Sequence, residues 1–220
     1  RSGLLHSSDL DRAKPINWKR RAATCGAIGV MGDLGMHAAH VPLRLGWDPR
    51  TVYALLDDVV RTRPGPGGEP VPCDTFDNAL LALTVQAAGR RFPMLWETKR
   101  IAPGERNTWF FEAVGMDGGV RFSTRSPQVL QRFGLVDGEQ AWSEVQPGHH
   151  SVWPTVTGGI FEFGLTDALL QMWAVFLAER AGELGDRFGA ATPHEALQSH
   201  RVFAAALRSH EEGTSVPLDS

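Results

Sequence analysis

Three side chains that can take part in proton transfer lie close together near the start of the chain: Asp33, His37 and His40. Residues three and four positions apart share one face of a helix. A carboxylate one turn from an imidazole suits general acid–base chemistry, because histidine titrates near neutral pH and a carboxylate can orient it. Two alternatives stay open: Asp33 only caps the helix beside a partly buried His37, or the three residues bind a metal with a fourth ligand such as His149. We expect no native metal site.

A helix is expected to position these side chains. Apolar residues recur at helical spacing from Leu34 to Leu45, and Gly46 suits the end of the helix. Pro42 lacks a backbone N–H group and predicts a kink or a helix that restarts there. The glycines before Asp33 let the chain turn sharply and approach another segment closely. The sequence therefore predicts a glycine-rich turn that leads into the helix.

The middle of the chain alternates between polar and apolar residues with the period of β-strands. Short turns such as Asp137-Gly138 favour antiparallel pairing, because parallel strands need long crossovers. Residues 1–24 are polar, and Pro15 excludes a long helix, so we expect irregular structure there. We expect a sheet of about six strands. The expected strand segments are residues 51–62, 78–87, 92–101, 107–114, 119–124, 129–136 and 140–145.

The last third of the chain is expected to be helical. Residues 161–184 are apolar on all sides of a helix, which predicts burial on more than one side. Thr192, Pro193 and Glu195 fit a capping box that begins a second helix, and Gly213 ends it. The fold class is therefore α+β: an open, mainly antiparallel sheet with helices packed on one face.

Composition limits the possible functions. The 220 residues are 42% hydrophobic and 21% charged, which suits a globular domain. A net charge of −3 gives no basic surface for nucleic acid. No apolar run is long enough for a membrane span, and two cysteines favour a reducing, cytoplasmic setting over a disulfide framework. The chain has no initiator methionine, so we expect it to begin inside a longer gene product.

A resemblance to a known family becomes specific around Asp33. Residues 29–37, Gly-Val-Met-Gly-Asp-Leu-Gly-Met-His, resemble the Gly-x-x-x-Asp-x-Gly-x-His motif of the glucose–fructose oxidoreductase and inositol dehydrogenase family. Residues 17–19 resemble its Asn-Trp-Arg segment, and residues 105–120 resemble its strand–turn–strand with Gly-x-x-Gly. The stretch from Ser209 to Gly213 resembles its Ser-x-x-x-Gly ending. The resemblance covers most of the chain in order.

The resemblance implies a two-domain enzyme of which residues 1–220 are the C-terminal domain, for substrate binding and oligomerisation. An N-terminal Rossmann domain that binds NAD or NADP would lie outside this chain. The family's glycine-rich nucleotide motif and its Glu-Lys-Pro lysine are absent here. We therefore expect no cofactor on this chain, and no turnover by the chain alone. By the same resemblance, His37 is the general acid/base and Asp33 positions a hydroxyl of a sugar or polyol.

Five further residues are expected to contact the substrate: Trp18, Lys19, His40, His149 and Trp153. An aromatic ring can stack on a sugar face and a lysine can form hydrogen bonds with its hydroxyls, although Trp18, Lys19, His149 and Trp153 could instead belong to ordinary packed or solvated loops. His40 stands where many members have an aspartate. An uncovered sheet face predicts a homo-dimer or tetramer. The alternative function is a non-catalytic sugar-binding or oligomerisation domain.

Overall fold

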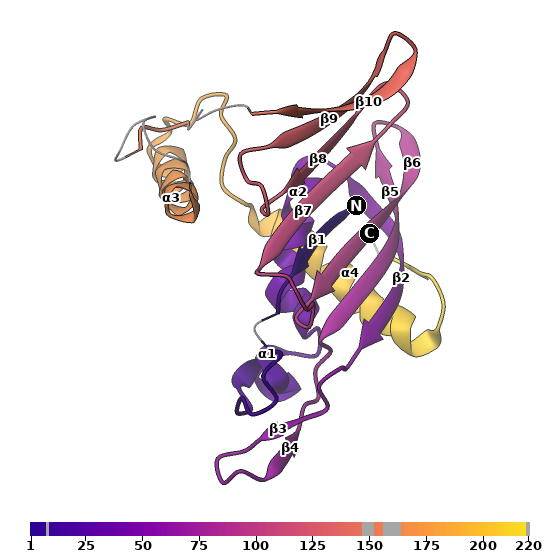
Figure 1. The fold of residues 1–220 in the computed structure, drawn as a ribbon, viewed down its shortest axis with the longest axis vertical. Helices are drawn as coiled ribbons and strands as arrows, with labels where there is room; N and C mark the ends of the chain where they lie inside the picture. Colours follow the sequence, from indigo (N-terminus) through magenta and orange to yellow (C-terminus); the bar gives the residue numbers. More distant parts are fainter. Residues whose placement is uncertain (8, 147–151, 156–163, 219–220) are drawn as a thin grey trace.

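A nine-stranded mixed sheet forms the centre of the molecule (Figure 1). The computed structural model describes all residues except 8, 147–151, 156–163 and 219–220. The strands lie in the order β10-β9-β8-β7-β1-β6-β5-β2-β11. They are β1 (Ser2–Leu5), β2 (Asp48–Asp57), β5 (Asn78–Ala87), β6 (Arg90–Lys99), β7 (Thr108–Val114), β8 (Gly119–Ser123), β9 (Leu130–Val136), β10 (Glu139–Val145) and β11 (Val216–Pro217). A separate hairpin pairs β3 (Thr62–Pro64) with β4 (Pro70–Pro72).

The β1 strand overturns one expectation, because the start of the chain is not irregular. It lies in the interior of the sheet, parallel to β6 and antiparallel to β7. Gly3 permits this position, since a Cβ there would lie 2.6 Å from the carbonyl oxygen of Glu97. Four residues are too few to show the alternating pattern of a strand, so the sequence did not reveal β1. Its partners, β6 and β7, lie far along the chain. The other pairs within the sheet are antiparallel, as predicted.

Helices cover one face of the sheet, which confirms the predicted α+β class. A π-helical turn, η2 (Met31–Gly35), leads into α2 (Met36–Arg44), and α4 (Pro193–Glu212) packs beside both. Figure 1 shows α2 and α4 behind the sheet. Pro42 lies inside α2. Small and apolar residues of α4, such as Val202 and Phe203, are fully buried against strand residues such as Trp96. Two short elements precede them: η1 (Trp18–Arg20) and α1 (Ala22–Cys25).

The predicted burial of the first late helix is wrong for this chain. The helix is α3 (Leu165–Ala181), and its large apolar side chains are 43–77% exposed, whereas Ala178 is buried. An apolar sequence on every side shows that the helix lacks a polar face, but it does not specify which surface covers it. Residues 161–163 of the predicted helix lie outside the described part of the chain. Among the helices that the structure describes, none has the length and hydrophobicity that crossing a membrane requires.

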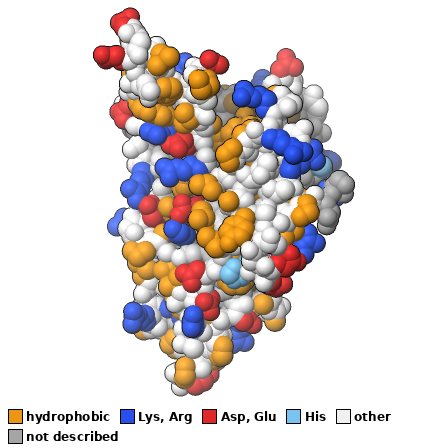
Figure 2. All heavy atoms as spheres, turned by 90° about the vertical axis from the view of Figure 1, so that its right-hand side faces the viewer, with side chains coloured by type: hydrophobic (Ala, Val, Ile, Leu, Met, Phe, Trp, Pro, Cys, Tyr) orange, Lys and Arg blue, Asp and Glu red, His pale blue; other side chains and the backbone are white. Residues whose placement is uncertain are grey.

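The second face of the sheet is open. Along β2, Val52 and Ala54 point to the helices, while Tyr53 and Leu55 are exposed on the opposite side. Register continues this exposed face into β5, where Leu80 pairs with Leu55, and into β6, where Leu95 pairs with Ala82 and is exposed. Figure 2 views the side of the molecule on which β2, β5 and β6 lie in Figure 1. It shows hydrophobic side chains in patches that are bordered by charged ones.

Candidate functional site

The candidate site begins with Asp33, which a π-helical turn presents in front of α2. Two glycines make this turn possible. Gly29 has a φ of +51°, and a Cβ there would lie 3.1 Å from the carbonyl oxygen of Phe76. A Cβ at Gly35 would lie 2.9 Å from the ring of Phe203 on α4. The glycines of the motif thus let the turn pack tightly between the sheet and α4, and this fixes the backbone at Asp33.

The carboxylate of Asp33 lies between two cations. The Nζ atom of Lys19 is 2.8 and 2.9 Å from its two oxygens, and Nη2 of Arg100 is 3.4 Å from Oδ2. The two cations differ in exposure: the side chain of Lys19 is 39% exposed and that of Arg100 is 3% exposed. Charge-assisted hydrogen bonds of this kind fix a carboxylate more firmly than neutral ones do. Asp33 is therefore held from its buried side and from its solvent side.

Arg100 is a site residue that sequence analysis missed. It follows the last residue of β6, and its backbone N–H donates to the carbonyl of Asp77 at 2.8 Å. Its Nη1 donates to the carbonyl of Lys19 at 3.2 Å. A signal was present in the sequence: Met94, Trp96 and Thr98 are buried on the helix side of β6, and the same period places Arg100 on that side. A charged residue on a core face needs a partner, and here that partner is Asp33.

The backbone around Lys19 is fixed from several directions. Asn17 caps η1 by accepting a hydrogen bond from the Lys19 backbone N–H at 3.0 Å. The hydroxyl of Thr75 donates to the Lys19 carbonyl at 3.0 Å. The next residue, Arg20, is buried and forms ion pairs with Asp9 and Asp77. The backbone of Lys19 is thus fixed, while its side chain is partly exposed and reaches Asp33.

His37 is exposed in the first turn of α2, four residues after Asp33. His40, one turn further, is half-buried. Burial lowers the pKa of His40 below its usual value. The attraction of Glu195 opposes this shift, while Arg44 and His37 add to it. In the described residues, no group of three or more histidine, cysteine, aspartate or glutamate side chains could hold a metal ion.

The structure brings together only some of the residues expected to contact substrate. Trp18 is 58% exposed, and Lys19 Nζ lies 5.6 Å from its ring centroid, so Trp18, Lys19 and Asp33 form one surface. The structure gives no contact between this surface and Trp153. His149 lies outside the described residues.

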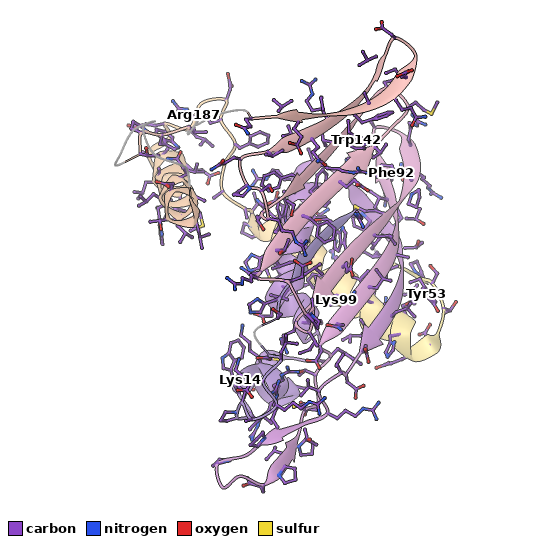
Figure 3. All side chains as sticks on the ribbon, viewed as in Figure 1. Lys14, Tyr53, Phe92, Lys99, Trp142 and Arg187 are labelled. Atoms are coloured by element: carbon purple, nitrogen blue, oxygen red, sulfur yellow. The ribbon has the colours of Figure 1, made fainter. Side chains whose placement is uncertain are left out.

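Trp153 lies in another part of the molecule. The guanidinium of Arg187 lies 4.3 Å from its ring centroid, and its backbone exchanges two hydrogen bonds with Gln171 of α3. Figure 3 shows Arg187 at the opposite end of the molecule from Lys14. Lys14 donates a hydrogen bond to Asp9, and Asp9 also accepts one from Arg20, the residue that follows Lys19. Lys14 thus marks the end of the molecule where Lys19 lies. Trp153 is therefore far from the Asp33 surface.

The glycine-rich turn does not fit a dinucleotide. A pyrophosphate needs open backbone N–H groups at the start of a helix that follows a strand. Here the positions where a ligand would approach Gly29 and Gly35 are filled by Phe76 and Phe203, and Ile28 lies against Gly32. The described residues thus use these glycines for internal packing, so no step involving NAD or NADP is assigned to them.

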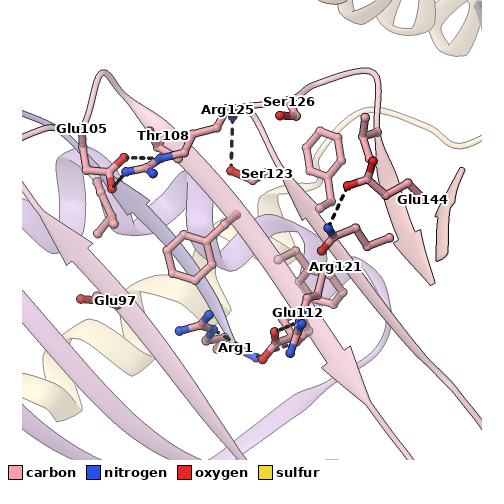
Figure 4. A pocket seen from close by; sticks show the side chains of 16 residues that line it. Arg1, Glu97, Glu105, Thr108, Glu112, Arg121, Ser123, Arg125, Ser126 and Glu144 are labelled. Atoms are coloured by element: carbon pink, nitrogen blue, oxygen red, sulfur yellow. Dashed lines mark hydrogen bonds and ion pairs between the residues drawn. The ribbon is translucent and has the colours of Figure 1, made fainter. Parts of the chain in front are cut away.

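The open face of the sheet carries a hollow of about 380 Å³ over β7, β8 and β9 (Figure 4). Its charged side chains pair with one another: Arg121 with Glu112, and Arg125 with Glu105. Figure 4 shows these side chains in front of the strands, with the helices behind. The hollow is therefore on the face opposite the helices, and its charges are already satisfied within the chain.

Comparisons with known proteins agree with this architecture. No family model matches the chain, and no curated protein matches it in sequence. Solved structures do match over its whole length. Levoglucosan dehydrogenase in complex with NADH and L-sorbose has 21% sequence identity and a TM-score of 0.79, with 100% of this chain and 58% of that chain covered. An NAD-binding oxidoreductase from Klebsiella pneumoniae has 21% identity and a TM-score of 0.81, with the same coverage.

An inositol dehydrogenase homolog from Azotobacter vinelandii, complexed with NAD+, has 16% identity and a TM-score of 0.74. That match covers 98% of this chain and 56% of the homolog. The chain thus spans less than two thirds of the length of these enzymes. Identities this low establish the fold alone. The chain therefore has the fold of the part of these NAD-binding oxidoreductases that it covers, as the resemblance to the glucose–fructose oxidoreductase and inositol dehydrogenase family predicted.

Proposed function

We propose that this chain is the substrate-side domain of an NAD(P)-dependent oxidoreductase that acts on a sugar, a polyol or a related hydroxyl compound. One observation carries the proposal. On the fold of such oxidoreductases, a carboxylate that two cations fix in place lies four residues before an exposed imidazole. The neighbours named levoglucosan dehydrogenase and inositol dehydrogenase homolog support this substrate class.

Each residue of the site has a separate task in this proposal. His37 accepts the proton of the hydroxyl that is oxidised, and Asp33 accepts a hydrogen bond from a substrate hydroxyl and so orients it. Lys19 donates to a substrate oxygen, and the exposed ring of Trp18 stacks on the apolar face of a sugar. NAD or NADP would supply the hydride acceptor from an N-terminal domain outside this chain.

The test uses the full-length protein with NAD or NADP and a panel of sugars and polyols. We expect His37→Ala to lower kcat by about 100-fold or more, because general acid–base catalysis contributes factors of that order. His200→Ala is the matched control, since His200 is an exposed histidine on α4. Turnover by His37→Ala at the rate of the control would refute the assignment of His37.

The second candidate function is a non-catalytic domain that binds a sugar or assembles through its sheet. The exposed apolar side chains on β2, β5 and β6 favour assembly, and we propose a homo-dimer or tetramer through this face. Assembly is compatible with either function. If the full-length protein binds a sugar but oxidises none of the panel with either cofactor, the non-catalytic function is the correct one.

A further inference from the structure

We infer that Arg100 is a positioning residue that holds Asp33 in place while Lys19 turns to the substrate. The inference rests on the proposed function, and it assigns different tasks to the two cations beside Asp33. Arg100 would keep one oxygen of the carboxylate fixed throughout the reaction cycle. Lys19 would leave the carboxylate when a hydroxyl compound enters.

Arg100 has the properties of a fixed anchor. Its side chain is 3% exposed, and its guanidinium reaches two different segments, the Lys19 carbonyl at 3.2 Å and Asp33 Oδ2 at 3.4 Å. Its backbone N–H donates a hydrogen bond to the carbonyl oxygen of Asp77. A planar guanidinium donates in fixed directions, so a buried arginine with two such contacts has little freedom to move. Its Nε has no hydrogen-bond partner among the described residues. Arg100 is therefore buried although one of its donors is unsatisfied.

Lys19 has the properties of an exchangeable partner. Its ammonium group ends a flexible four-carbon side chain, lies partly in solvent and bonds both oxygens of Asp33. Its backbone, in contrast, is fixed by Asn17, Thr75 and Arg100. Rotation of the side chain alone would therefore move the charge from Asp33 toward a ligand that lies on Trp18.

The two contacts on Asp33 explain why both cations are needed. Arg100 contacts only Oδ2, whereas Lys19 contacts Oδ1 as well. When Lys19 turns away, Oδ1 becomes free to accept a hydrogen bond from a substrate hydroxyl. Arg100 stays on Oδ2, so the half-buried carboxylate keeps a counter-charge and a fixed orientation. Without Arg100, departure of Lys19 would leave Asp33 unpaired.

The test compares kcat and KM for single variants of the full-length enzyme with its best substrate from the panel. We expect Arg100→Met to lower kcat roughly 10- to 100-fold, because a misplaced orienting group affects the reacting geometry. We expect Lys19→Met to act mainly on KM, with a rise of about 10-fold from the lost charged hydrogen bond. Arg63→Met is the matched control: Arg63 is equally buried, but it donates to the backbone carbonyls of Asp9 and Asp11. The control should keep kcat per folded molecule.

A double-mutant cycle with Asp33→Asn distinguishes positioning from a general structural role. If Arg100 acts through Asp33, its substitution should change kcat little in the Asp33→Asn background. Arg100→Lys serves in the same cycle if Arg100→Met does not fold, because lysine keeps the charge but loses the two-segment contact. Independent, multiplying effects of the two substitutions would overturn the inference. If Asp33→Asn and His37→Ala both turn over like the wild type, the proposed function fails instead.

Discussion

At the scale of single residues, the site rests on a buried ion-pair network. Arg20 is 1% exposed and bonds the carboxylates of Asp9 and Asp77, and Lys14 adds a second cation at Asp9. Burial raises the pKa of Asp9, but hydrogen bonds from Lys14 and Arg20 outweigh it and leave that pKa below its usual value. Arg20 follows Lys19 in η1, so we expect this network to hold η1 in position.

We expect Arg20→Met to reduce the free energy of unfolding by about 3–5 kcal/mol, because it leaves the buried carboxylate of Asp77 without a counter-ion and leaves Asp9 with Lys14 alone. Chemical denaturation of the variant and the wild type measures this loss. Arg61→Met is the control, since Arg61 is highly exposed and its ion pair with Asp58 spans 3.5 Å. The control should stay within about 0.5 kcal/mol of the wild type. An equally small loss for Arg20→Met would show that the network is not essential to the fold.

At the scale of elements, the start of α4 fixes how the helices meet. Thr192 accepts a hydrogen bond from the Glu195 backbone N–H, and the Glu195 side chain accepts one from the Thr192 N–H. Arg44 of α2 forms an ion pair with Glu195 at 2.8 Å and donates to the carbonyls of Gly189 and Ala190. The predicted capping box is thus confirmed. It also joins α4 to the helix that contains His37.

We expect Thr192→Ala to cost about 1 kcal/mol of stability, the usual loss when a helix cap is removed. Thr192→Ser keeps the hydroxyl and should retain most of the stability. Thermal unfolding followed by circular dichroism compares the two variants under the same conditions. If both variants melt at the same lowered temperature, the methyl group rather than the cap would be responsible.

At the scale of the whole molecule, two apolar surfaces are left exposed by the residues that the structure describes. One is the open face of the sheet, with Tyr53, Leu55, Leu80 and Leu95, and the other is α3. The register aligns Leu55 with Leu80 across neighbouring strands, and Leu95 faces Ala82 on the next strand pair, so apolar side chains lie close together on this face. Such a patch on a twisted sheet suits a second copy of the same face.

We expect the double variant Leu80→Lys/Leu95→Lys of the full-length protein to sediment as a smaller species than the wild type, because two buried charges on each side disfavour the interface. Met116→Lys is the control, because Met116 is 90% exposed in the turn between β7 and β8. A wild-type protein that sediments as a monomer would refute assembly through the sheet.

The sequence by itself determined the features that depend on interactions between residues close in the sequence, namely strand periodicity and helix caps. The alternating period gave β5 at residues 78–87 without error, and Thr192, Glu195 and Gly213 marked the ends of α4. Caps and side-chain periods depend on neighbours within a few residues, so the sequence records them directly.

Only the tertiary structure decided the features that join distant segments. The pairing of β1 with β6 and β7, and the contact of Arg100 with Asp33 across 67 positions, have no local pattern that would reveal the partner. The same holds for Trp153, which loop character alone assigned to the site and which lies with α3 instead. Contacts of this kind form because buried charges and strand edges must be paired, and folding supplies the partners from segments that are distant in the sequence.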